Sequence, residues 1–288
     1  MGIEGSRVGE AESLLDFTVG SVEEGGTPYI GDSHVEVLLG LRYPRTDQSA
    51  ELSFYVTGKV QELLFKLLFT EVNAARDLLL DDYLGPALWR LRRAGHAQRM
   101  LTTSWKQVST IAPAEFVALQ DELGGMAPES QFLMYRSFGY RRLEFALGGK
   151  SPEIAAVYAA VPRLRTLIEA TLRAPSLYDG VLALLLRRGV NIPVECVERD
   201  FARPYEPHPA VEQAWAGIYR EARGELYSLA EALTELDHQY DRWRTTHLLT
   251  VERLLGHKPG TGTPGAVWPG PVAEHRFFPE LRAARSEV

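Results

Sequence analysis

The chain has 288 residues and 45% of them are hydrophobic, so it is long enough to bury one substantial core. Its formal net charge of −7 argues against nucleic acid or an anionic membrane as its main partner. The single cysteine excludes an intramolecular disulfide framework, and no apolar run is long enough to span a membrane. The acidic N-terminus is unlike a signal peptide. We therefore expect a cytoplasmic protein.

Residues 1–27 are polar and rich in glycine, and we expect a flexible arm there, followed by one domain over residues 28–288. A short helix is predicted for residues 33–41 and a polar turn for residues 43–50. No strand pattern and no internal repeat stands out along the chain. The periodic apolar stripes therefore predict an all-α protein, a single-domain helical bundle.

A long helix is predicted from about Glu51 to Asp81, because its apolar residues recur at steps of three and four. Its expected broad apolar face consists of Phe54, Val60, Leu63, Leu64, Leu67, Leu68, Val72 and Leu79. Gly58 stands inside this helix, where glycine costs about 1 kcal/mol relative to alanine. Either bulk is unwanted at this position or the helix bends there.

Further helices are predicted from roughly Pro86 to Ile111, with Trp105 on the core face, and from Pro113, because proline is favoured at the first helical position. Residues 151–200 have the pattern of three or four short helices. The charge run Arg199–Arg203 is interpreted as a solvated loop.

The last long helix, Leu226 to Gly256, holds the candidate metal ligand. Its apolar stripe consists of Leu226, Leu229, Leu233, Leu236, Tyr240, Trp243, Val251 and Leu254. His247 occupies one position on that stripe, whereas His96 is expected on the surface. Two interpretations of His247 stay open at this point: a core histidine hydrogen-bonded to a neighbour, or a metal or haem ligand.

The loop after this helix, residues 257–265, is rich in glycine but fits neither common nucleotide-binding motif. A Walker-type loop needs Lys and Ser/Thr directly after its last glycine, and here Lys258 precedes Gly260. The dinucleotide fingerprint needs a preceding strand, and this loop follows a helix. We therefore exclude both nucleotide-binding interpretations.

The end of the chain resembles a known family. The residues that carry the resemblance are His247, Val251-Glu252-Arg253, Gly256, Lys258 and Gly260-Thr261-Gly262. Together they are similar to the C-terminal motif of tryptophan 2,3-dioxygenases and their haem-dependent aromatic oxygenase relatives. Further similar segments are Glu62–Lys66, Tyr140–Phe145, Pro175–Asp179 and Phe277–Leu281. The resemblance implies an all-α bundle with haem b held non-covalently between helices by His247 as the single proximal ligand.

The resemblance also implies roles for other residues. Trp105, Tyr140, Arg141 and Gly262 are the expected cofactor contacts, and Thr261 is expected over the amino-acid end of the substrate. The expected substrate-binding residues are Phe54, Phe116, Gln120, Tyr135, Arg136 and Tyr29. Tyr29 is expected to reach into the pocket of a neighbouring subunit, so we expect a homotetramer or at least a homodimer.

Two departures from the family pattern concern the substrate. Gly58 stands where the dioxygenases place a distal histidine, and Gln120 stands where an arginine clamps the substrate carboxylate. Glutamine cannot reproduce a bidentate arginine–carboxylate pair. Arg136 is a candidate for the missing cation, or else a solvated surface arginine.

These departures favour a haem-dependent mono-oxygenase that adds one oxygen atom to an indole or phenol ring of an aromatic amino acid, in a natural-product pathway. The alternative is an authentic tryptophan 2,3-dioxygenase that forms N-formylkynurenine, and a third interpretation is a non-catalytic haem-binding sensor. The sequence leaves open the substrate and the choice between O2 and peroxide as oxidant.

Overall fold

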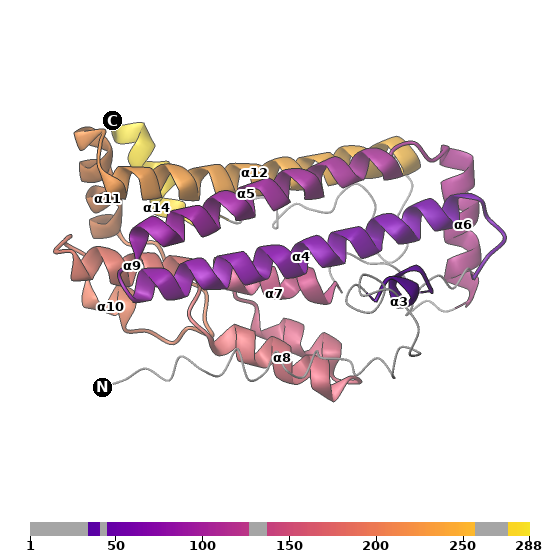
Figure 1. The fold of residues 1–288 in the computed structure, drawn as a ribbon, viewed down its shortest axis with the longest axis horizontal. Helices are drawn as coiled ribbons and strands as arrows, with labels where there is room; N and C mark the ends of the chain where they lie inside the picture. The colour runs from indigo at the N-terminus through magenta and orange to yellow at the C-terminus, as the bar shows by residue number, and fades with distance from the viewer. Residues whose placement is uncertain (1–33, 41–44, 127–136, 257–275) are drawn as a thin grey trace.

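The computed structural model describes residues 34–40, 45–126, 137–256 and 276–288 (Figure 1). The predictions for the arm at residues 1–27 and for the glycine-rich loop lie outside the described residues. The same holds for five individual predicted positions, which are Tyr29, Tyr135, Arg136, Thr261 and Gly262.

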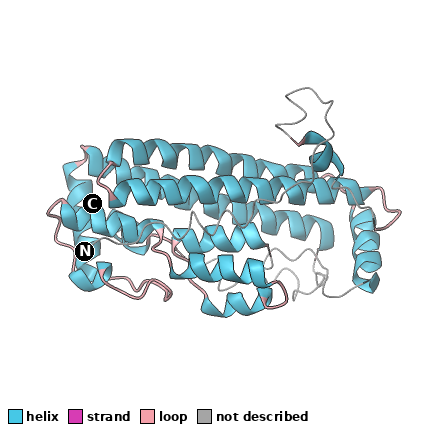
Figure 2. Cartoon of the chain, turned by 60° about the horizontal axis from the view of Figure 1, so that its bottom comes forward, coloured by secondary structure: helices cyan, strands magenta, loops and turns pink. Residues whose placement is uncertain are grey.

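Every regular element within the described ranges is a helix, so the predicted all-α fold class is confirmed (Figure 2). The α-helices are α3 (Val35–Gly40), α4 (Ala50–Leu80), α5 (Leu84–Val108), α6 (Pro113–Met126), α7 (Phe138–Leu147), α8 (Pro162–Arg173), α9 (Leu177–Arg187), α10 (Val194–Val197), α11 (Pro209–Glu221), α12 (Glu225–Leu255) and α14 (Pro279–Ala284), and the 3-10 helices are η4 (Pro152–Tyr158) and η5 (Arg285–Glu287).

The three longest helices run side by side along the molecule (Figure 1). The two longest are α4 and α12, with 31 residues each, as the sequence predicted. A short connection turns α4 back into α5, and α12 also packs against α5. α7 and α9 pack against α4. None of the described helices is both long and apolar enough to cross a membrane.

The buried stripe of α12 follows the predicted spacing. Leu229, Leu233, Tyr240 and Trp243 are all at most 1% exposed. The helix ends at Gly256, whose φ of 58° lies in the region that glycine adopts without a steric penalty. The predicted position of the C-terminal glycine cap is therefore confirmed.

The prediction of one broad apolar face on α4 is wrong. Phe65 and Leu68 are buried, but Val60, Leu63 and Leu67 are 41%, 54% and 44% exposed. At about 100° per residue these two sets point in opposite directions, so the helix has two separate apolar stripes. Only one of them faces the core.

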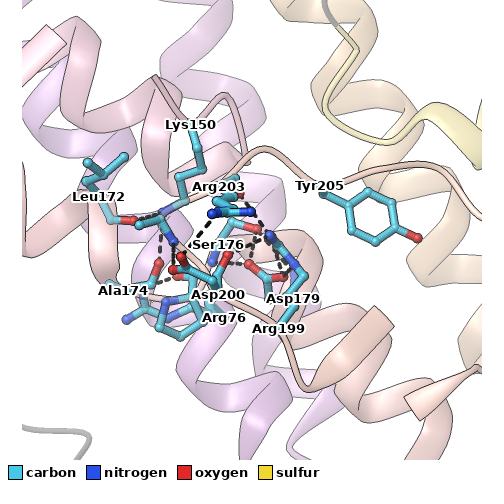
Figure 3. Close-up of polar contacts among 12 residues, drawn as sticks. Arg76, Lys150, Leu172, Ala174, Ser176, Asp179, Arg199, Asp200, Arg203 and Tyr205 are labelled. Atoms are coloured by element: carbon cyan, nitrogen blue, oxygen red, sulfur yellow. Dashed lines mark hydrogen bonds and ion pairs between the residues drawn. The ribbon is translucent and has the colours of Figure 1, made fainter. Parts of the chain in front are cut away.

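The interpretation of Arg199–Arg203 as a solvated loop is wrong for Arg199. Its Nη2 lies 2.7 Å from Oδ1 of Asp179, and its Nε donates to the same oxygen at 2.9 Å. The Asp179 side chain is 3% exposed and also accepts hydrogen bonds from Ser176 at the start of α9 (Figure 3). Arg203, in contrast, has a side chain that is 81% exposed.

Lys150 ties the neighbouring chain segments together in the same region. Its Nζ donates hydrogen bonds to the carbonyl oxygens of Thr171, Leu172 and Ala174, at 3.0, 3.0 and 2.8 Å (Figure 3). These carbonyls lie in the last turn of α8 and just beyond it, where backbone acceptors have no partner within the helix. The buried Lys150 side chain therefore closes the corner between α8 and α9.

We expect the Arg199→Ala variant to lose about 3 kcal/mol of unfolding free energy, because it leaves a buried carboxylate unpaired. Arg203→Ala is the matched control, and an exposed side chain of this kind changes stability by no more than about 0.5 kcal/mol. Urea unfolding monitored by circular dichroism measures both. Equal effects of the two substitutions would contradict the assignment of Arg199 to the core.

Candidate functional site

His247 lies on α12 close to two tryptophans. Its imidazole stacks on the indole of Trp105 from α5, with ring centroids 4.5 Å apart and an interplanar angle of 12°. The ring of Trp243, one turn earlier on α12, lies 6.3 Å away at 24°. The residue is half-buried, so its ring is fixed by neighbours while part of its surface stays open.

The surroundings keep the imidazole neutral. Desolvation among these side chains lowers the pKa of His247 from 6.5 to about 4. At neutral pH one ring nitrogen is therefore unprotonated, which is the form of histidine that binds metals.

Aromatic rings from α4 and α6 stand at the same end of the bundle. Phe54 and Phe116 meet edge to face, with centroids 5.6 Å apart. Gln61 of α4 donates a hydrogen bond to Oγ of Ser104, the neighbour of Trp105, at 3.0 Å. This contact fixes α4 against the part of α5 that carries the stacked indole.

Gly58 lies on α4 between Phe54 and Gln61. A Cβ atom built at this position would meet no atom within 4 Å. Close packing therefore does not require a glycine here, and there is room for a side chain. Gln120 is half-buried on α6, one turn after Phe116.

Tyr140 and Arg141 lie in a second group, next to Trp243. The Tyr140 ring packs 5.4 Å from Trp243, and its hydroxyl donates to Oε1 of Glu144 at 3.2 Å. Burial raises the pKa of Tyr140 to about 12. Arg141 forms an ion pair with Glu144 and is mostly buried. The structure thus places Tyr140 against Trp243 and links Arg141 to the same group through Glu144.

Sequence reasoning missed Arg244 in this group. Arg244 is 7% exposed, its guanidinium lies 4.4 Å from the centroid of the Tyr240 ring, and its Nη2 is 3.9 Å from Oε1 of Glu144. It stands one position off the apolar stripe, where an arginine usually reaches solvent. The one signal in the sequence is its i, i+4 spacing from Tyr240.

The site fits haem better than a bare metal ion. In the described part of the chain, no group of three His, Cys, Asp or Glu side chains could hold an ion. Haem iron, in contrast, can be bound by a single neutral imidazole surrounded by aromatic side chains. The buried Nε1 atoms of Trp105 and Trp243 also lack hydrogen-bond partners among the described residues. Buried N–H groups are normally hydrogen-bonded to an acceptor. A bound haem would offer carboxylates and a flat apolar ring.

Comparisons with known proteins agree with this geometry. The family described as tryptophan 2,3-dioxygenase matches residues 15–165. A tryptophan 2,3-dioxygenase of Bacillus cereus is 35% identical over 257 residues, which cover 88% of this chain and 90% of the relative. One from Burkholderia pseudomallei is 36% identical over 257 residues, covering 88% and 82%.

The chain belongs to the tryptophan 2,3-dioxygenase family. This confirms the predicted family and, at the level of enzyme class, a haem-dependent oxygenase for a small aromatic substrate. The expected insertion of a single oxygen atom is not confirmed. The comparisons support the alternative, a ring-opening tryptophan 2,3-dioxygenase, better than that first expectation.

We expect the haem-free protein to lose stability as the pH falls from about 6.5 to 4. The folded-state pKa of His247 is about 4 and its ordinary value is 6.5. Between these pH values His247 binds a proton in the unfolded chain but not in the folded chain, which favours unfolding. Above pH 6.5 this contribution is fully present. Melting curves measure the slope, which should shrink in His247→Gln and persist in His96→Gln. An unchanged slope in His247→Gln would contradict the burial of the ring.

Proposed function

We propose that this member of the tryptophan 2,3-dioxygenase family uses O2 to open the indole ring of tryptophan, or of a close relative, giving an N-formylkynurenine-type product. The observation that carries the proposal is the neutral His247 imidazole stacked on Trp105, in a chain that is 35–36% identical to named tryptophan 2,3-dioxygenases. The catalytic domain of the proposal spans residues 28–288.

His247 would hold the iron of haem b, with Trp105 beside it. When bound, the haem supplies the oxidising chemistry, and the protein contributes binding, orientation and the exclusion of water. The resemblance assigns further cofactor contacts to Tyr140, Arg141 and Gly262. The packing of Tyr140 on Trp243 supports an indirect role for it, through the helix that carries His247.

The substrate ring would lie against Phe54 and Phe116, whose edge-to-face contact closes the end of the bundle between α4 and α6. Both side chains are apolar, so they exclude water from the ring without competing for hydrogen bonds. The amino-acid end would be held by Thr261, with Gln120 as a neutral hydrogen-bonding partner.

Arg136 is the proposed source of the positive charge for the substrate carboxylate, and Tyr135 and Tyr29 are the proposed remaining contacts. Gln120 cannot form a bidentate pair with a carboxylate, so a cation from elsewhere is needed for tight binding.

The second candidate function is the insertion of one oxygen atom into an intact aromatic ring. Gly58 and Gln120 favour it, because together they remove two groups that would hold the indole in one pose. Open space around the Cβ position of Gly58 gives the ring room to move. A ring displaced by about 1 Å can change a rate about a hundredfold.

Product masses test these candidates. The haem-loaded protein is incubated separately with tryptophan and tyrosine, under O2 and under peroxide. We expect tryptophan under O2 to gain two oxygen atoms and to yield N-formylkynurenine. A gain of one oxygen atom would support the second candidate. No product from tryptophan, from ring-substituted tryptophans or from tyrosine would contradict both candidates and leave the non-catalytic sensor.

We also propose a homotetramer, or at least a homodimer, in which the segment around Tyr29 enters a neighbouring subunit. The exposed apolar residues of α3, namely Val37, Leu38 and Leu39, support an arm that needs a partner surface. Light scattering at the mass of a single chain, 32.2 kDa, would contradict this part of the proposal.

A further inference from the structure

The first turn of α7 is held against α4 by a contact here called the α4–α7 clasp, which consists of Glu62, Ser137 and Gly139. The Ser137 hydroxyl donates a hydrogen bond to Oε1 of Glu62, and the backbone N–H of Gly139 donates to Oε2 at 3.1 Å. The same hydroxyl accepts a hydrogen bond from the backbone N–H of Tyr140 at 3.1 Å. A negative side chain of α4 thus completes the N-terminal cap of α7, where free N–H groups and the helix dipole favour an anion.

The clasp brings the two helices closer together than an ordinary side chain would allow. A Cβ atom at Gly139 would lie 2.6 Å from Oε2 of Glu62 and 2.9 Å from the Cβ atom of Phe65. Desolvation raises the pKa of the Glu62 carboxyl, so its oxygens face protein although part of the residue reaches solvent. The distance between α4 and α7 is therefore fixed at this point.

Three buried rings from three helices meet beside the clasp. The centroid of the Phe65 ring of α4 lies 5.7 Å from those of Tyr140 and Trp243, and these two lie 5.4 Å apart. All three side chains are at most 1% exposed. The ring of Trp243 lies 6.3 Å from that of His247. Because protein interiors are closely packed, a shift of α7 moves these rings instead of being absorbed by empty space.

The face of α4 that carries Phe65 also leads to the proposed substrate side of the site. At about 100° per residue, Phe54, Gly58 and Phe65 fall within an arc of about 40°. Glu62 lies between Gly58 and Phe65 in the sequence. The clasp therefore acts on the part of α4 that lies between the proposed substrate wall and the ring cluster.

We propose that Glu62 is a positioning residue for haem binding. Through the α4–α7 clasp it sets how closely α7 approaches α4, and through Tyr140 and Trp243 this distance sets the orientation of the His247 imidazole. The inference rests on the proposed function, in which His247 holds the haem iron. Groups that orient a metal-binding histidine affect how strongly it binds the metal.

Haem titration of two matched glutamate variants tests the proposal. Glu71 is the control, because it lies on the same helix and pairs with Arg90 and Arg93 of α5 at 3.3 and 3.2 Å. We expect Glu62→Ala to weaken haem binding by about tenfold, which is the lower end of the effect of losing a group that orients a metal ligand. Glu71→Ala should bind haem like the parent protein. Unchanged haem affinity in Glu62→Ala, or an equal loss in Glu71→Ala, would overturn the proposal.

A conservative pair of substitutions at Ser137 separates the hydrogen bonds from loss of the fold. Ser137→Thr keeps a hydroxyl that can donate to Glu62 and cap α7, whereas Ser137→Ala loses both bonds. We expect Ser137→Thr to bind haem like the parent protein and Ser137→Ala to bind it several-fold more weakly. In the Glu62→Ala background the loss caused by Ser137→Ala should be smaller, because the two side chains act together. Fully additive losses would show that Glu62 does not act through the clasp.

The haem-free protein gives a readout that is independent of catalysis. Near-UV circular dichroism reports on the fixed packing of buried aromatic rings. We expect Glu62→Ala to weaken the near-UV signal while the far-UV helical spectrum stays unchanged, and Glu71→Ala to keep both spectra. An unchanged near-UV spectrum in Glu62→Ala would contradict the proposal. If the spectrum and the haem affinity change as expected but tryptophan is not turned over, the proposed reaction is wrong and the role of Glu62 stands.

Discussion

Replacing His247 by alanine should abolish tight haem binding. His247 lies where α5 meets α12, and its imidazole stacks on Trp105. Because desolvation keeps the imidazole neutral, one of its ring nitrogens is unprotonated. Loss of groups that merely orient a metal ligand costs 10- to 100-fold in affinity. Loss of the ligand itself should therefore weaken haem binding by more than about 100-fold, as measured by haem titration of the Soret band.

Two controls separate loss of the ligand from loss of the fold. His96 is exposed on α5, and His96→Ala should bind haem like the parent protein. His247→Gly with added imidazole should recover part of the Soret spectrum, because the free base fills the space of the missing side chain. If His247→Ala keeps an unchanged spectrum and His96→Ala does not, the assignment of the ligand is wrong.

The second large effect concerns the substrate. Gly58→His combined with Gln120→Arg should tighten tryptophan binding by about 10- to 150-fold, which corresponds to the roughly 1.5–3 kcal/mol of a hydrogen bond to a charged group. The new histidine fits, because a Cβ at position 58 meets no atom within 4 Å. The new arginine gives the carboxylate a bidentate partner.

The matched control for the double variant is Gly217→His, placed in α11 away from the site. Its Cβ would also meet no atom within 4 Å, and it is half-buried like Gly58. Both glycine substitutions should raise helix stability by roughly 0.3–0.5 kcal/mol. Calorimetric titration with tryptophan should then separate them. Equal tryptophan affinity in the double variant and the parent protein would show that Gly58 and Gln120 do not face the substrate.

The helices could be predicted from the sequence because their apolar residues repeat at steps of three and four. That rule predicted the ends of α4 to within one residue, yet it could not tell which of its two apolar stripes is inside. Val60 and Leu63 look like core residues in the sequence. Their exposure depends on where α5, α7 and α9 pack, which is long-range information.

The candidate site was predictable to a similar extent. His247 stood out because a polar residue interrupts an apolar stripe, and the family motif gave it a role. Its stack on Trp105 joins residues 142 positions apart in sequence, so spacing alone could not reveal it. Arg199 and Arg244 were missed for the same reason, since their partners Asp179 and Glu144 lie on other helices.

Locating the iron tests the account most directly. Crystals of the haem-loaded protein, measured at the iron absorption edge, give an anomalous difference peak at the metal. We predict a single strong peak within bonding distance of a ring nitrogen of His247, with the haem beside Trp105 and its other face towards Gly58. An iron peak at another side chain, or a haem-loaded protein in which His247 stays stacked on Trp105 without touching iron, would contradict the account.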